Sequence, residues 1–457
     1  VPILRSFMAS APPLSPPADG QSSLLIHAIE VAFYTNSQVL IYVAVGAYSV
    51  YSGVVDGGAL RKLAGLVLNA LFPALTFSMF VAYTAERVAD WSPILVVALL
   101  HIYGGGLMGK LGAKLFRLRS PHEQLCILSV AFGNVASLPF VMIGPIVNNW
   151  RGAVEYRGQT ITPSEAVQYA GGMIALYSGM WVINFFSVGK WYVSTIPELG
   201  EAAEDPQPRE AAAPEGAAPP PLPLWKRLYK LTTSLVLEPT VFGTLLALLV
   251  GCVPALKDTA CGTHENCDNG ALRFIATSTK GLGDTGVTLS TIVLGAALML
   301  SYKAARAKVA AARTAATEMA VTSERGAPSN ELVESAETEE RTMLHRRGAR
   351  WWHLSDKQRA YIVIISIKLI LLPAVAFPIS YAAVEAGLIP KDDGLLQIII
   401  YMQAAVPSSQ TAVSFLAASG KPNLSQELSG LYLPQYVLSV FTIAFSIVSA
   451  ISLIGES

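Results

Sequence analysis

Long apolar stretches separated by short polar segments run along most of this chain. A helix needs roughly 20 apolar residues to cross the roughly 30 Å hydrocarbon layer of a membrane. Ten stretches reach about that length: 36–55, 61–83, 92–116, 123–147, 165–193, 231–253, 274–302, 360–386, 395–418 and 427–454. The pattern predicts an all-α membrane protein with ten transmembrane helices embedded in a lipid bilayer.

Segments of different composition separate the predicted helices into groups. A Pro-rich N-terminal segment occupies 1–35, and the first five helices occupy 36–193. Residues 194–230 are rich in Pro, Ala and acidic residues, which cannot bury a core, so we expect a flexible cytoplasmic linker there. The remainder comprises spans 6 and 7 in 231–302, a long charged cytoplasmic loop in 303–359, and spans 8 to 10 in 360–457.

Charge content excludes several classes of protein. Charged residues make up 14% of the chain, against roughly 25% in an ordinary soluble domain, so a soluble enzyme is excluded. The 32 Lys and Arg residues balance the 32 Asp and Glu residues, so nothing indicates a nucleic-acid partner. The sequence has no Walker-type Gly-rich loop, and we expect no cofactor.

Basic residues are distributed unequally between the two sides of the predicted membrane. With both termini on the non-cytoplasmic side, 23 Lys and Arg residues lie on the cytoplasmic side and 7 on the other. Cytoplasmic loops normally carry the excess of Lys and Arg, so this orientation is expected.

Two cysteines, Cys261 and Cys267, fall in a loop that this orientation places outside the cytosol, where oxidation is permitted. His264 lies between them, but two sulfurs and one imidazole lack the fourth ligand of a zinc site. We therefore expect a disulfide between Cys261 and Cys267, ahead of free thiols and of a metal site.

The two halves of the chain correspond to each other most clearly in spans 4 and 9. Span 4 contains Gly133-Asn134-Val-Ala-Ser137-Leu-Pro139, and span 9 contains Gln403-Ala-Ala-Val-Pro407-Ser408-Ser409-Gln410. Each has a proline among small and polar residues near the middle of the span. Because each half has five spans, the second half enters the membrane upside down relative to the first. The sequence thus predicts a 5+5 inverted repeat, an arrangement common in secondary transporters.

Proline removes a backbone donor and disfavours helix at the preceding residue. We expect Pro139 and Pro407 to break their helices, with the broken helices crossing near the middle of the membrane. The helix N-termini created by the breaks carry positive partial charge, which favours an anion. The alternative is that the two prolines only kink packed helices.

Three ionisable residues fall in or near apolar spans, where a charge is costly and often functional. Lys368 can be a counter-charge for an anion or an ion-pair partner of Asp284. Asp284 can accept a coupling proton, cap a helix break, or pair with a lysine. His101 is expected first as a hydrogen-bonded packing residue.

These motifs resemble the auxin efflux carrier superfamily, especially its PIN-LIKES branch. The resemblance rests on spans 4 and 9, on Leu282-Gly283-Asp284 in span 7, and on Lys368 with Leu371-Leu372-Pro373 in span 8. It departs from that branch at Ser137 and Gln410, where the branch has asparagines.

The resemblance implies a crossover of spans 4 and 9 and elevator-type transport of a small organic anion such as indole-3-acetate. By position it assigns Asn134 and Pro139 to the first half of the crossover and Pro407 and Gln410 to the second. Ser137, Gln403, Ser408 and Ser409 complete the predicted substrate-binding and crossover residues. It also implies a homodimer and a location in the endoplasmic reticulum, with the plasma membrane second.

Two other functions fit parts of the sequence. A sensor or scaffold of the same fold would bind its ligand at the crossover without transporting it. Gly281-Leu-Gly283-Asp284 also matches the Gly-x-Gly-Asp signature of intramembrane proteases, whose chemistry needs two aspartates. The preceding span, 231–253, contains no aspartate, so the protease is a remote alternative.

Overall fold

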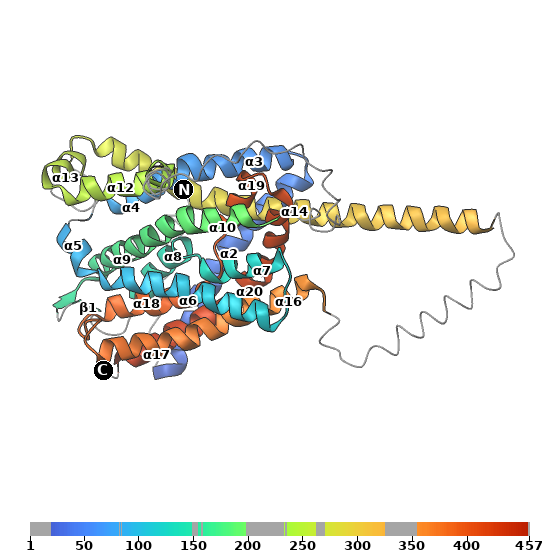
Figure 1. The fold of residues 1–457 in the computed structure, drawn as a ribbon. Coiled ribbons are helices and arrows are strands. Elements are labelled where there is room, and N and C mark those ends of the chain that lie inside the picture. Colours follow the sequence, from blue (N-terminus) through green and yellow to red (C-terminus); the bar gives the residue numbers. More distant parts are fainter. Residues whose placement is uncertain are drawn as a thin grey trace, which may run out of the picture.

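The computed structural model describes residues 20–81, 83, 85–148, 154–156, 159–197, 233, 235–261, 270–324 and 354–455. Helices dominate this part of the chain (Figure 1). The elements before the linker are α2 (Gly20–Tyr51), α3 (Gly57–Leu66), η1 (Val67–Leu71), α4 (Phe72–Phe80), α5 (Ala85–Asp90), α6 (Pro93–Leu115), α7 (His122–Ala131), α8 (Ser137–Asn148), β1 (Val154–Tyr156), β2 (Gln159–Ile161), α9 (Pro163–Asn184), η2 (Phe185–Gly189) and α10 (Lys190–Thr195). Those after it are α12 (Pro239–Cys252), α13 (Pro254–Ala260), α14 (Arg273–Glu324), α16 (Asp356–Ile365), η4 (Ser366–Leu371), α17 (Leu372–Glu385), α18 (Gly394–Ala405), α19 (Thr411–Ala418) and α20 (Pro422–Gly455).

Membrane-spanning helices are well represented among the described residues. By length and apolar composition, 6 helices are able to cross a membrane, or 7 when the bent pair α12 and α13 is taken as one span. All ten predicted stretches are mostly helical, but the predicted spans 4 and 9 are each divided between two shorter helices. The prediction of a helical membrane protein is confirmed.

Two helices extend into segments that the sequence places outside the spans. Helix α2 begins at Gly20, inside the predicted N-terminal segment 1–35, and α14 continues to Glu324, inside the predicted loop 303–359. Residues 303–324 are rich in alanine and lack Gly and Pro, so nothing stops the helix where the membrane-spanning part ends. Most of the predicted linker 194–230 and residues 325–353 of that loop lie outside the described residues.

A short β-hairpin lies between α8 and α9 in the otherwise helical part of the chain that the structure describes. Its strands β1 and β2 are antiparallel, with Val154 opposite Ile161 and Tyr156 opposite Gln159. The Tyr156 hydroxyl accepts a hydrogen bond from Trp91 Nε1 at 3.1 Å, which fixes the hairpin to the segment between α5 and α6. Three-residue strands carry too little periodicity to be recognised in the sequence.

Helices α2, α4, α12 and α14 pack together through glycines, and we call them, with α3 and η1, the scaffold group. A Cβ atom on Gly46 of α2 would lie 2.0 Å from the Ile292 carbonyl oxygen of α14. A Cβ atom on Gly295 of α14 would likewise lie 2.0 Å from the Val43 carbonyl oxygen of α2. The two helices are therefore in backbone contact, at a separation that only glycine permits.

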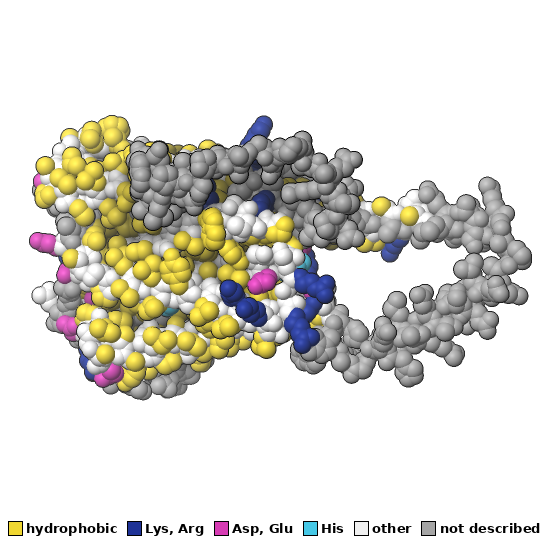
Figure 2. All heavy atoms as spheres, in the orientation of Figure 1, with side chains coloured by type: hydrophobic (Ala, Val, Ile, Leu, Met, Phe, Trp, Pro, Cys, Tyr) yellow, Lys and Arg dark blue, Asp and Glu magenta, His cyan; other side chains and the backbone are white. Residues whose placement is uncertain are grey.

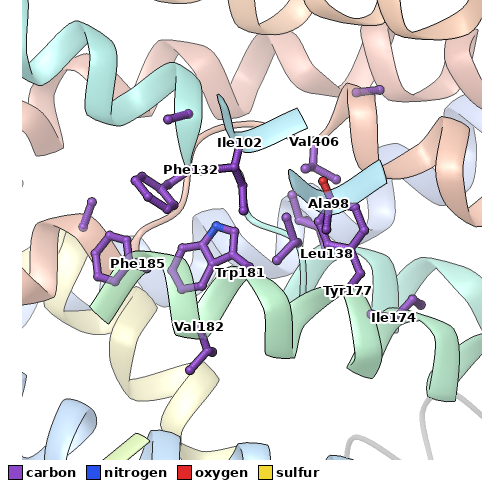
Figure 3. Packing of buried hydrophobic residues seen from close by; sticks show 14 of the residues in the cluster. Ala98, Ile102, Phe132, Leu138, Ile174, Tyr177, Trp181, Val182, Phe185 and Val406 are labelled. Atoms are coloured by element: carbon purple, nitrogen blue, oxygen red, sulfur yellow. The ribbon is translucent and has the colours of Figure 1, made fainter. Parts of the chain in front are cut away.

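Helices α6 to α10 and α16 to α20, with η2 and η4, form a second group of described helices, which we call the crossover group. Part of its core is aromatic: the rings of Trp181 and Phe185 stack with centroids 4.7 Å apart, and Phe132 meets both rings edge-on (Figure 3). Phe132 lies at the end of α7, and the other two rings lie on α9 and η2. The core thus packs directly against the point where α7 stops.

The surface has an apolar band between two more polar ends. Figure 2 shows hydrophobic side chains over most of the helical body. On this face most Lys and Arg side chains lie towards the end from which α14 projects, and most Asp and Glu side chains lie towards the opposite end. An apolar band of this kind is suited to a lipid bilayer.

Candidate functional site: the crossing of two broken helices

Both predicted breaks are present. Helix α7 ends at Ala131, and its C-cap residue Phe132 is extended, with ψ 97°. Helix α18 ends at Ala405, and Val406 is extended with ψ 143°. Val406 precedes Pro407, so its conformation is the one that proline imposes on its neighbour.

Pro139 has a different position from the one predicted. The chain resumes helix at Ser137, so Pro139 lies in the first turn of α8 and follows the break. Proline is tolerated there because the first amides of a helix have no intrahelical partner. Phe132 to Ala136 form the break itself.

The two unwound segments cross and pair through their backbones. The Asn134 amide donates to the Pro407 carbonyl at 2.7 Å, and the Ser409 amide donates to the Phe132 carbonyl at 2.9 Å. Gly133 and Ser408 face each other as an antiparallel bridge. Irregular backbone at membrane depth is stable only when such groups are satisfied within the protein, and this pairing satisfies them.

Helix α20 holds the crossing through side chains that the sequence analysis missed. The Tyr436 hydroxyl donates to the Ser408 carbonyl at 2.9 Å and accepts from Asn134 Nδ2 at 3.0 Å. Gln435 Oε1 accepts from the Ser408 amide at 3.2 Å. The available signal was Tyr432-Leu-Pro-Gln435-Tyr436, a polar and aromatic run in an apolar span.

An open pocket, which we call the cavity, lies between the crossing and the scaffold group. Of the predicted site residues, Asn134, Ser137, Ser409 and Gln410 line it. The opposite wall comes from α4, α12 and α14, and α9 forms one side. The lining residues that were not among the predicted site residues are Phe72, Leu75, Thr76, Met79, Gly133, Val135, Ala136, Ser178, Trp181, Val182, Thr240, Val287 and Thr411.

The other four predicted site residues support the crossing instead of lining the cavity. Ser408 is fully buried and donates through Oγ to the Ser129 carbonyl at 2.7 Å. Gln403 Nε2 donates to the Val135 carbonyl at 2.9 Å. Pro139 and Pro407 shape the backbone as described above. These four residues therefore belong to the crossover part of the predicted site, and a role for them in substrate binding stays a prediction.

The cavity is polar at the crossing without carrying charge there. Among the described residues that line it there is no Asp, Glu, Lys, Arg or His. Ser137 Oγ donates to Asn134 Oδ1 at 2.5 Å, so the Asn134 amide is fixed from both ends. Gln410 Oε1 is buried without a hydrogen-bond partner in the described part of the chain. An amide group with an unused oxygen can turn to present its donor to a ligand.

The three ionisable candidates lie apart from the cavity lining. His101 is buried on α6, and its Nδ1 lies 2.9 Å from the Tyr177 hydroxyl, as expected of a packing residue. Lys368 is buried in η4, and its Nζ donates to the Val130 carbonyl at 3.1 Å. The described hydrogen-bond partner of Lys368 is thus a backbone carbonyl and not Asp284. The Asp284 side chain is exposed on α14, one turn before Val287.

Cys261 is disulfide-bonded, whereas Cys126 and Cys252 are free thiols. The expected partner, Cys267, lies outside the described residues. Within the part of the chain that the structure describes, no group of three or more His, Cys, Asp or Glu residues is arranged to hold a metal ion.

Comparison with known proteins gives concordant results. Residues 32–447 match the family described as membrane transport protein. The chain is similar to the protein PIN-LIKES 6 of Arabidopsis thaliana, with 21% identity over 489 aligned positions that cover 97% of both chains. It is also similar to PIN-LIKES 5 of the same plant, with 23% identity over 303 positions that cover 61% of this chain and 74% of the relative.

Proposed function

The chain belongs to the membrane transport protein family, and we propose that it moves a small organic anion such as indole-3-acetate across a membrane. Membership confirms the predicted resemblance to auxin efflux carriers of the PIN-LIKES branch. The family consists of transporters and is not an enzyme class, so the intramembrane protease alternative is excluded. The observation that carries the proposal is the cavity at the crossing of the two broken helices.

The proposed topology is ten spans in a 5+5 inverted repeat. The 6 helices that meet the length criterion and the bent pair α12–α13 supply seven of these spans. The broken pairs α7–α8 and α18–α19 and the 32-residue helix α2 supply the other three. The two breaks occupy equivalent places in the two halves, as an inverted repeat requires.

An anion suits this cavity because neutral donors surround it. Helix α8 begins at Ser137, and its first backbone hydrogen bond is the one from the Phe140 amide to the Ala136 carbonyl. The amides before Phe140 therefore have no partner within the helix. The positive end of the helix therefore faces the crossing, next to Asn134. A carboxylate bound there would replace its hydrogen bonds to water with hydrogen bonds to amides. No charged side chain among the described lining residues would hold the carboxylate too tightly for release. Phe72 and Trp181 offer apolar walls for an aromatic ring.

The position of the cavity supports an elevator mechanism. Its walls come from the scaffold group on one side and the crossover group on the other, so movement of one group past the other would carry the ligand with the crossing. We place the scaffold as the stationary part. We further propose that both termini are non-cytoplasmic and that the carrier forms a homodimer in the endoplasmic reticulum, with the plasma membrane second.

Adjacent serines provide a test of the site. Ser409 lines the cavity, whereas Ser408 faces away from it and bonds Ser129. Ser409→Ala is expected to raise the half-saturating substrate concentration about 3- to 10-fold, which corresponds to one hydrogen bond of about 1 kcal/mol. Ser408→Ala is expected to lower the melting temperature and leave that concentration within 2-fold. Concentration-dependent uptake into proteoliposomes and thermal unfolding measure the two effects. A raised half-saturating concentration in Ser408→Ala, with none in Ser409→Ala, would refute the site.

An ion pair between the two groups tests the elevator. Lys190 of α10 pairs with Glu238, the N-cap residue of α12, which links the crossover group to the scaffold group. Lys190→Glu or Glu238→Lys places like charges together and should change the population of this conformation about 2- to 5-fold, because a partly exposed pair contributes at most about 1 kcal/mol. The double exchange should restore it.

The readout is the labelling rate of a cysteine placed at Val287 in the cavity wall, with Cys126 and Cys252 replaced by Ser. Each single reversal should alter that rate, and the double exchange should return it to the starting value. A double exchange that labels like the single variants would show that the pair does not link moving parts.

A further inference from the structure

Lys368 is a buried lysine at the crossing that takes no part in the proposed substrate site. Its side chain is 2% exposed, on the π-helical turn η4 between α16 and α17. Its Nζ donates to the Val130 carbonyl, and a Cβ atom on Gly133 would lie 3.0 Å from that nitrogen. The ammonium thus lies against the unwound segment of α7–α8, yet Lys368 is not among the residues that line the cavity.

The carbonyl to which Lys368 donates belongs to the last turn of α7, where a helix carries negative partial charge. Helices α7 and α18 both end at the crossing, at Ala131 and Ala405, and the last carbonyls of a helix lack intrahelical partners. Several side chains donate to carbonyls here, among them Ser408 to Ser129, Gln403 to Val135, Tyr436 to Ser408, and Lys368 to Val130. Lys368 is the member of this set that brings a full positive charge.

Carbonyls of unwound segments and half-helix C-termini are the groups that coordinate Na⁺ in secondary transporters with broken helices. A lysine ammonium carries the same charge as Na⁺ and directs N–H donors at the same kind of oxygen. Because it is attached to the chain, it cannot leave the site as a bound Na⁺ can. From this placement we propose that Lys368 is a tethered cation that occupies the position of a coupling ion, stabilises the crossing, and makes transport independent of Na⁺. The inference rests on the proposed transport function only for its last part.

Shortening the side chain tests the proposal, because it vacates the position of the charge. In Lys368→Ala, ethylammonium can enter the space left by the end of the lysine side chain. We expect a lowered melting temperature that 50 mM ethylammonium chloride raises by several degrees relative to choline chloride, and uptake that the same salt raises at least 3-fold. Wild-type protein should show the same melting temperature and uptake in sodium, ethylammonium and choline chloride.

Two further variants serve as controls. Lys357→Ala removes a half-exposed lysine that pairs with Glu427 and should not respond to ethylammonium. Lys368→Met keeps the apolar stem and fills the space, so it should lose uptake at least 10-fold and gain nothing from the salt; it also serves if the alanine variant does not fold.

Three results would overturn the tethered cation. The first is Na⁺-dependent uptake by the wild type, and the second is uptake by Lys368→Met at the wild-type level. The third is a folded Lys368→Ala variant that ethylammonium does not stabilise. Melting temperatures need no substrate. Ethylammonium-specific stabilisation of Lys368→Ala, with no uptake of any anion by the wild type, would therefore support the tethered cation and count against the proposed function instead.

Discussion

Asn134→Ala is expected to lower uptake at sub-saturating substrate about 10- to 150-fold while the protein stays folded. The Asn134 side chain lines the cavity, and its orientation is fixed by Tyr436 and Ser137. A hydrogen bond to a charged partner contributes about 1.5–3 kcal/mol, which corresponds to that range. The backbone bond from the Asn134 amide to the Pro407 carbonyl does not depend on the side chain, so the crossing itself should persist.

Asn184→Ala is the matched control for this prediction. Asn184 is also a buried asparagine that accepts from a hydroxyl, that of Tyr103 at 2.8 Å, but it does not line the cavity. Both variants should lose a similar amount of thermal stability, and the Asn134 variant alone should lose uptake. Equal uptake by the two variants would remove Asn134 from the binding site.

Gly295→Val is expected to destabilise the protein by about 3 kcal/mol or more. Its Cβ atom would meet the Val43 carbonyl oxygen at 2.0 Å, and a backbone atom in a helix cannot give way unless α2 and α14 separate. Overpacking a core ordinarily costs about 1–3 kcal/mol, and a clash with backbone lies at the upper end or beyond. Thermal unfolding of the purified protein measures the effect.

The same helix supplies the control for this substitution. Gly281 of α14 has open space around its Cβ position, so Gly281→Val changes helix propensity equally without a clash. Its melting temperature should stay close to that of the wild type. Equal losses in the two variants would mean that the contact between α2 and α14 does not determine stability.

Hydropathy was sufficient to predict the helical membrane fold, and the prolines indicated which two spans are broken, although Pro139 follows its break. Both signals are local: an apolar stretch of about 20 residues has few alternatives to a membrane helix, and Pro407 imposes an extended conformation on Val406 wherever it occurs. Asn134 and Gln410 were identified for the same reason, because they are polar residues beside those breaks.

The orientation of individual side chains at the crossing was not predictable. Ser408 and Ser409 are equivalent in the sequence, and only the antiparallel pairing with Gly133 turns the first away from the cavity. Tyr436 and Lys368 reach the crossing from helices distant in the chain. The sequence placed Lys368 with Asp284 or an anion, whereas the packing of η4 against α7 gives it a carbonyl.

Transport at the crossing is tested by uptake of radiolabelled indole-3-acetate and benzoate into proteoliposomes that contain the purified protein, with ligand-induced shifts in melting temperature recorded on the same protein. We predict that at least one of these carboxylates raises the melting temperature and also accumulates saturably, above protein-free liposomes. A carboxylate that stabilises the protein but never enters the liposomes would identify a sensor and contradict transport at the crossing.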